Sequence, residues 1–354
     1  MFFLIAAACL AIMIVMFIYK IFIKTSTMAL VMAAGILLHG VLFHLADRKL
    51  FILQWLSAWT IALWVLFAFS ILLSFLYRQF GALHIVNPIN RFGIGTWVAG
   101  TSIISVLIYE QFEGWQPFAV LLSYANIGLW LFYLLASIQS FYKLRQSGKP
   151  PYTHGILLLT TVSTQSIVLL LNTVHTQVPP TLDAALIATG LFFYAISFAF
   201  IIHDCFRPGW TIEDHWSNTN CIIHGALSIT GFACLTSDAV SMEAAESLWA
   251  IATAAFLIIE TIEFIRLVKR LKRYSFKEGI WTYNVTQWSR LFTFGMFYTF
   301  TSLVTLDSPF LSIVQTIVLL GGPPVIILLF AIEAGICLPS VIKEMRVLRK
   351  KQAA

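Results

Sequence analysis

The hydrophobic positions of the chain fall into eleven long segments that are separated by short polar connections. Most segments hold on the order of 20 apolar residues, which is the length that an α-helix needs to cross the hydrocarbon core of a bilayer. We therefore predict an all-α integral membrane protein with spans at 2–23, 28–46, 50–77, 92–109, 115–142, 152–174, 181–203, 218–237, 245–266, 285–305 and 310–336.

Two kinds of segment alternate along the chain. The segments that begin near positions 28, 92, 152, 218 and 285 are rich in Gly, Ser, Thr, Asn and His, and each is followed by a mostly aliphatic and aromatic segment. The polar segments begin roughly 65 residues apart, and a fixed period is typical of repeated helical units. The pattern predicts five tandem helical hairpins around a central pore, with the polar helices inside, plus one extra N-terminal transmembrane helix.

These segments divide the chain into an extra helix (1–27), a ten-helix transporter or channel domain (28–340) and a basic tail (341–354). The first segment lacks a basic stretch before it and a cleavage site, so we interpret it as a retained span. Basic residues gather after the fifth segment, in 266–277 and in the tail, and basic loops stay cytoplasmic. We expect a multi-pass cell-membrane protein with a cytoplasmic C-terminus and an outer N-terminus, to which Arg48 and Lys49 are the exception.

The last polar segment carries an arginine within a span. Such a charge costs about 2.5 kcal/mol or more and usually faces a cavity or a partner. Steps of three and four residues place on one helical face a stripe formed by Gln287, Arg290, Phe294, Phe297 and Thr301. We interpret this stripe as the wall of a narrow passage, in which Arg290 attracts an anion. The alternative is that Arg290 is an anchor that extends to the cytoplasmic interface.

The other polar segments also concentrate small or polar residues on one face. The candidates to line the passage are His39, Gly93, Thr96, Gly100, Thr161, Gln165, His224 and Ser228. The alternative is that these residues serve close packing between membrane helices.

Composition supports a membrane protein and excludes several functions. The chain is 59% hydrophobic and 11% charged, whereas soluble domains hold about 25% charged residues. The net charge of +6 resides in a few loops, without the solvated basic surface that a nucleic acid would need. The function is therefore expected within the lipid bilayer, with no nucleic-acid partner.

Motifs for catalysis or cofactors are missing from the sequence. The five cysteines show no CxxC spacing, and the eight histidines form no HxxxH or HExxH pair. We interpret Glu260, Glu263 and Arg266 as a cluster with a Glu263–Arg266 ion pair, and we expect Gly321–Pro324 to break or kink the last helix. We expect no enzyme, no cofactor and no metal. A membrane-embedded, histidine-dependent redox enzyme or sensor is the alternative.

Two motifs resemble the tellurite-resistance/dicarboxylate transporter family, which includes the plant slow anion channels. NPINRFGIGTWVAGTS, at 87–102, is similar to the entry of the family's third helix, with Pro88 and Arg91 in place. WSRLFTFGMF, at 288–297, is similar to the aromatic-Thr-Phe run of the ninth helix. The resemblance implies that Phe294 is a gate in the pore, that the protein is a homotrimer, and that it transports a small anion by a passive or proton-coupled route.

Overall fold

The computed structural model describes residues 2–147 and 152–353, and in this part of the chain all regular structure is helical. The first half contains α1 (Phe2–Tyr19), η1 (Thr25–Met28), α2 (Ala29–Ile36), η2 (Leu37–Leu42), α3 (Phe43–Leu45), α4 (Phe51–Leu76), η3 (Gly81–Ile85), η4 (Asn90–Ile94), α5 (Gly95–Gln111), η5 (Glu113–Trp115), α6 (Gln116–Gln146), η6 (Gly155–Leu158) and α7 (Leu159–Val174). The second half contains α8 (Pro180–Cys205), η7 (Asn218–Cys221), α9 (Ile222–Thr236), α10 (Met242–Arg273), α11 (Phe276–Gly279), α12 (Gln287–Leu303) and α13 (Pro309–Ala353).

A helical segment lies at each of the eleven predicted spans, so the all-α fold class is confirmed. Among the described residues, nine helices are long and apolar enough to cross a membrane. α12, with 17 residues, and the apolar helix Phe3–Tyr19 are shorter. The sequence predicts a break or a kink at Gly321–Pro324. α13 continues as one helix through Pro323 and Pro324, so a break is wrong, and a kink stays a prediction. Neighbouring helices and local adjustment let membrane helices tolerate such prolines.

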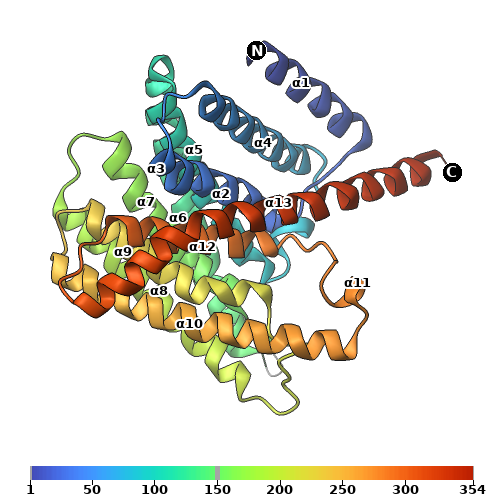
Figure 1. The fold of residues 1–354 in the computed structure, drawn as a ribbon. Coiled ribbons are helices and arrows are strands. Elements are labelled where there is room, and N and C mark those ends of the chain that lie inside the picture. Colours follow the sequence, from blue (N-terminus) through green and yellow to red (C-terminus); the bar gives the residue numbers. More distant parts are fainter. Residues whose placement is uncertain (1, 148–151, 354) are drawn as a thin grey trace.

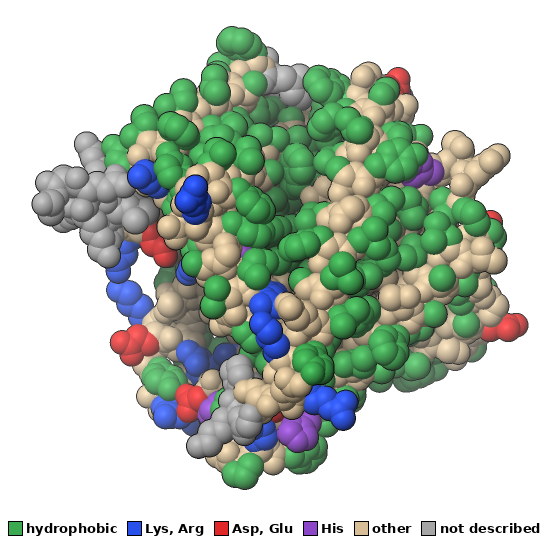
Figure 2. All heavy atoms as spheres, turned by 180° about the vertical axis from the view of Figure 1, so that it is seen from behind, with side chains coloured by type: hydrophobic (Ala, Val, Ile, Leu, Met, Phe, Trp, Pro, Cys, Tyr) green, Lys and Arg blue, Asp and Glu red, His purple; other side chains and the backbone are tan. Residues whose placement is uncertain are grey.

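Burial separates the helices into the same two kinds that polarity separates. In the apolar windows of Asn90–Gln111, Gly155–Val174 and Asn218–Thr236, 89% of the residues are buried. The corresponding value is 33% for Phe51–Leu76 and 11% for Pro309–Glu344. Figure 2 shows hydrophobic side chains spread over one face of the molecule, as expected for helices that lipid surrounds.

The buried helices contact one another in a closed order. α2 packs against α5, α5 against α7, α7 against α9, α9 against α12, and α12 returns to α2. Four of them also pack against the exposed helix that follows each in the chain, in the pairs α5–α6, α7–α8, α9–α10 and α12–α13. α1 lies at the edge of the molecule beside α4 (Figure 1).

Four buried helical segments begin with a short 3₁₀ turn, formed by η1, η4, η6 and η7. These turns start roughly 65 residues apart, which matches the period of the polar segments. η1 contacts η4, η4 contacts η6, and η6 contacts η7. We call these four turns, with the residues that hydrogen-bond to them, the polar collar. The collar lies at the end of the bundle that is predicted to be cytoplasmic.

Candidate functional site

A small cavity lies between four of the five buried helices. Its volume is about 30 Å³, which leaves room for on the order of one water molecule. The residues around it come from α5, α7, α9 and α12, and they are Ala99, Ser102, Ile103, Val106, Ser166, Leu169, Leu170, Ile229, Phe292 and Met296. We call this space the central cavity, and almost all of its lining is apolar.

Phe292 and Met296 are the α12 side chains at the central cavity. They lie four residues apart and therefore on one face of the helix. Phe292 is 5% exposed and Met296 is 3% exposed, so both are packed in place. A wide, water-filled path is therefore not open at this level in the structure.

Phe294 lies on the other side of α12. Its ring is 5.1 Å from the ring of Phe256 and 6.1 Å from the ring of His224, measured between centroids. Since successive residues turn by 100° around a helix, Phe292 and Phe294 point in nearly opposite directions. Phe294 does not line the central cavity, so the structure does not bring the residue that the motif indicated as a gate to this constriction.

Three further residues of the stripe on α12 also face α10. The Arg290 guanidinium lies 2.9 Å from Glu263, the Phe297 ring lies 4.8 Å from the Phe256 ring, and Thr301 accepts a hydrogen bond from Trp249 at 2.9 Å. These contacts place Arg290, Phe294, Phe297 and Thr301 at the interface between α10 and α12, and none of the four lines the central cavity. Polar side chains are accommodated on this face of α12 because α10 supplies an ion-pair partner for Arg290 and a hydrogen-bond donor for Thr301.

Several other predicted lining residues take part in helix packing. Thr161 donates to the carbonyl of Gly190 at 2.9 Å, and Gln165 donates to the carbonyl of Ile187 at 3.2 Å, both on α8. Thr96 and Ser228 donate to carbonyls of their own helices, and Gly93 and Gly100 lie against η1. The alternative that these residues serve close packing accounts for them.

Two serines at the central cavity were missed in the sequence. Ser102 donates to Ser166 at 3.1 Å, and Asn126 of α6 donates to Ser102 at 2.9 Å. Ser102 belongs to the quoted motif at 87–102, but periodicity alone did not distinguish it from its neighbours. Phe292 was likewise inside a quoted motif.

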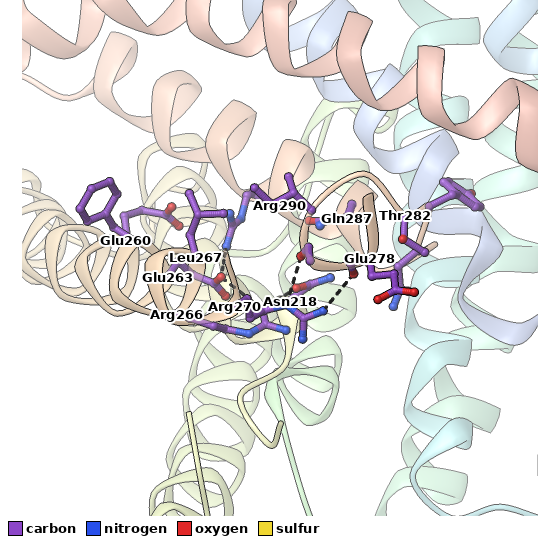
Figure 3. A pocket seen from close by; sticks show the side chains of 15 residues that line it. Asn218, Glu260, Glu263, Arg266, Leu267, Arg270, Glu278, Thr282, Gln287 and Arg290 are labelled. Atoms are coloured by element: carbon purple, nitrogen blue, oxygen red, sulfur yellow. Dashed lines mark hydrogen bonds and ion pairs between the residues drawn. The ribbon is translucent and has the colours of Figure 1, made fainter. Parts of the chain in front are cut away.

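A larger pocket lies between α10 and α12, away from the central cavity. Its volume is about 520 Å³. Figure 3 shows Arg290 of α12 and Glu263 of α10 pointing toward each other, with Glu260 farther along α10. The lining residues are Asn218, Glu260, Glu263, Phe264, Arg266, Leu267, Arg270, Glu278, Gly279, Ile280, Thr282, Tyr283, Asn284, Gln287 and Arg290. We call this space the lateral pocket.

Glu263 is the central charge of the lateral pocket. One of its oxygens lies 3.3 Å from Arg266 and 2.9 Å from Arg290, which confirms the predicted Glu263–Arg266 ion pair. The other oxygen accepts a hydrogen bond from Trp216 at 2.8 Å. Glu263 thus neutralises one charge where two guanidinium groups meet, which explains how an arginine is accommodated inside α12.

A second charged group lies near the opposite end of the buried helices. His39 is 3.3 Å from Glu110, and Arg48 is 3.7 Å from the same carboxylate. His39 belongs to η2, a turn of π-helix, and such turns often occur at functional sites. His39 faces Glu110 of α5 and is not among the residues that line the central cavity.

The polar collar contains two histidines, of which His84 is buried and His154 is half-buried. Both precede the apolar helical segments Asn90–Gln111 and Gly155–Val174 of the structure. His84 lies 2.9 Å from the hydroxyl of Thr25, and His154 lies 2.7 Å from the hydroxyl of Thr219. Burial lowers the pKa of each histidine to about 4, because a charged imidazole would lose its hydration. Both rings are therefore neutral at pH 7.

Among the residues that the structure describes, no group of three His, Cys, Asp or Glu side chains could hold a metal ion. No family model and no curated protein matches this chain. The likeness of the two motifs to the tellurite-resistance/dicarboxylate transporter family therefore stays a prediction.

Proposed function

We propose that the five buried helices enclose a passage for small anions, and that Phe292 and Met296 close it. The observation that carries the proposal is the apolar constriction of about 30 Å³ between α5, α7, α9 and α12. A hydrophobic constriction of this kind can gate a channel because it expels water until its side chains move aside. The closed order of contacts among the buried helices supports a single axis.

The preference for anions rests on charge and on the motif. The chain holds 22 Lys and Arg against 16 Asp and Glu. An excess of positive potential at the mouth of a pore raises the local concentration of anions. The motif at 288–297 resembles the gate helix of anion channels, and in this proposal Phe292, the first residue of its aromatic-Thr-Phe run, takes the gating role instead of Phe294. The same resemblance supports a homotrimer, which light scattering of the purified protein would test.

The test is anion flux into liposomes that contain the purified protein. Phe292→Ala should raise chloride and nitrate flux about tenfold, which corresponds to a barrier lowered by about 1.4 kcal/mol. Phe294→Ala is the matched control, since it removes the same ring from the α10 side of the helix, and we expect nearly unchanged flux. Met296→Ala should raise flux by a smaller factor.

The proposal fails if Phe292→Ala protein, shown to be folded, passes none of the tested anions. It also fails if Phe294→Ala opens the path and Phe292→Ala does not. In that case the path runs between α10 and α12, on the other side of the helix.

A further inference from the structure

The lateral pocket shares no lining residue with the central cavity, so its role is separate from the passage. It is large enough for a metabolite-sized ligand, because small-molecule sites commonly occupy about 300–1,000 Å³. Three guanidinium groups line it, from Arg266, Arg270 and Arg290 (Figure 3). Such a concentration of arginine beside a membrane span needs an explanation beyond anchoring.

The arginines are only partly engaged. Arg290 and Arg266 share Glu263, and the Nε atom of each is buried without a hydrogen-bond partner among the described residues. Arg266 also donates to the side-chain oxygen of Asn218 at 2.6 Å. A guanidinium presents its donors as a planar fork that matches a carboxylate or a phosphate. The two Nε donors are unsatisfied, and they would gain a partner if such a group bound beside them.

Arg270 supplies the third charge. Its donors reach the backbone carbonyls of Gly279 at 3.1 Å and Glu213 at 3.3 Å. These carbonyls fix the position of the guanidinium but do not neutralise it. In the same region the Glu213 carboxylate lies 3.2 Å from Lys269.

Glu260 is the second carboxylate that faces the arginines from inside the membrane span. Within the described ranges, its one ion-pair contact under 4 Å is with His224, at 3.9 Å. His224 is fully buried, and in the described structure neither of its ring nitrogens has a hydrogen-bond partner. One carboxylate oxygen of Glu260 is also buried without a hydrogen-bond partner among the described residues. A proton on Glu260 would supply a donor where this oxygen and the His224 ring nitrogen now meet.

The groups that face Glu260 come from three helices. They are His224 of α9, Glu263 of α10 and Arg290 of α12, together with Cys221 of η7. Glu278 and Tyr283 complete the rim of the pocket from the segment before α12. Three arginines oppose Glu260, Glu263 and Glu278, so a proton on Glu260 leaves one positive charge without a counter-charge.

We propose that the lateral pocket binds one small oxyanion, a carboxylate or a phosphate, between Arg290 and Arg266, and that Glu260 takes up a proton when the anion binds. The anion replaces the charge that Glu260 gives up, so the pocket stays neutral in both states. His224 accepts the hydrogen bond of the protonated Glu260 in the bound state. The site needs no movement of Phe292 and is independent of the proposed passage.

The test is calorimetric binding to the full chain in nanodiscs of phosphatidylcholine, with succinate and inorganic phosphate as probes and chloride as the monatomic comparison. Wild-type protein should bind both oxyanions at pH 5.5, and the affinity should fall by up to about tenfold per pH unit as Glu260 ionises, because one proton is linked to binding. Succinate and phosphate also ionise in this range, so Glu260→Gln should keep only the pH dependence that comes from the probe's own ionisation and lose the additional dependence seen in wild type.

The arginine is tested by a change that keeps its charge. Arg290→Lys retains the ion pair to Glu263 but loses the fork, so we expect binding at least about tenfold weaker. Arg145→Gln, which removes an exposed arginine outside the pocket, should bind as wild type. Phe292→Ala should also bind as wild type, which separates this site from the passage.

A second set of nanodiscs distinguishes free oxyanions from lipid headgroups. If a lipid phosphate is the natural occupant, phosphatidic acid in the nanodisc should compete with inorganic phosphate, and Arg290→Lys should remove the competition. If a soluble anion is the occupant, phosphatidic acid should leave the affinity unchanged. Either result supports an oxyanion site in the pocket.

The proposal is overturned by any of three results in folded protein. They are the absence of binding with both oxyanions at every pH, unchanged binding in Arg290→Lys, and a wild-type pH dependence in Glu260→Gln.

Discussion

The central cavity and the lateral pocket lie on opposite sides of α12, and they are lined by different kinds of side chain. The central cavity holds about 30 Å³ and is lined on its α12 side by Phe292 and Met296, whereas the lateral pocket holds about 520 Å³ and contains arginines and glutamates. One helix therefore separates a small, mostly apolar cavity from a charged pocket. Among the described residues that line these two spaces, the charged side chains all belong to the lateral pocket.

The comparison shows what a polar face on a membrane helix signifies. A polar group within a span needs a partner, because lipid supplies none. On α12 that partner is α10, which presents Glu263 to Arg290 and Trp249 to Thr301. The two polar side chains at the central cavity, Ser102 and Ser166, likewise find a partner, since they hydrogen-bond to each other.

Removing the central carboxylate of the lateral pocket should have the largest effect on stability. Glu263→Ala leaves Arg266 and Arg290 together without their shared counter-charge, and breaking a buried ion pair costs about 3–5 kcal/mol. The measurement is the apparent Tm of the purified protein in detergent. Glu260→Ala, one turn away on the same helix, is the control and should lower the Tm much less, because Glu260 has no arginine within ion-pair distance among the described residues. Equal losses from the two variants would show that the pocket does not depend on Glu263.

Adding a single methyl group at the polar collar should have the next largest effect. A Cβ atom at Gly155 would lie 1.9 Å from the backbone oxygen of Thr219, so η6 and η7 would have to move apart. Overpacking of this kind costs about 2–3 kcal/mol when the backbone must shift. Gly155→Ala should therefore lower the Tm and weaken the contact between neighbouring repeats.

Gly128 of α6 provides the matched control for this change. A Cβ atom there would meet nothing within 4 Å among the described residues, and the position is exposed on an outer helix. Gly128→Ala should be neutral or slightly stabilising, because alanine favours the helix. A Tm loss in Gly128→Ala that equals the loss in Gly155→Ala would contradict the close approach of η6 and η7.

The sequence predicted the helices and the alternation between buried and exposed ones, because both follow from hydrophobic length and period. It did not predict which neighbour each polar face meets. Gln165 and Arg290 were both assigned to a passage, yet Gln165 bonds to α8 and Arg290 to α10. Periodicity locates a face on a helix but does not say what packs against that face.

The same limit applies to the gate. Phe292 and Phe294 stand in one motif and differ by two residues, which places them on opposite sides of α12. The choice between them depends on how α12 is rotated within the bundle, and that rotation is set by side chains of other helices, such as Phe256. The hydrophobic pattern also did not predict where α10 ends. The helix continues to Arg273, past the apolar residues, because the basic residues that follow them also favour a helix.

Acid should act in opposite directions on the collar and on the lateral pocket, and the effect of each collar histidine is the smallest that we expect. The pKa of His84 and of His154 is about 4 in the folded protein against an ordinary value near 6.5, so the unfolded chain binds more protons between these values and stability falls as the pH falls through this window. At pH 5.5, one unit below the ordinary value, each histidine lowers the free energy of unfolding by about 1.4 kcal/mol. In His154 the ring nitrogen that accepts the backbone N–H of Ile156 would lose this bond on protonation.

The Tm should therefore decrease from pH 7.5 to pH 5.5 and decrease less in His84→Asn and His154→Asn, while oxyanion binding at the lateral pocket strengthens over the same range. A pH dependence that survives in the His84→Asn/His154→Asn double variant would mean that groups other than the two collar histidines take up the protons.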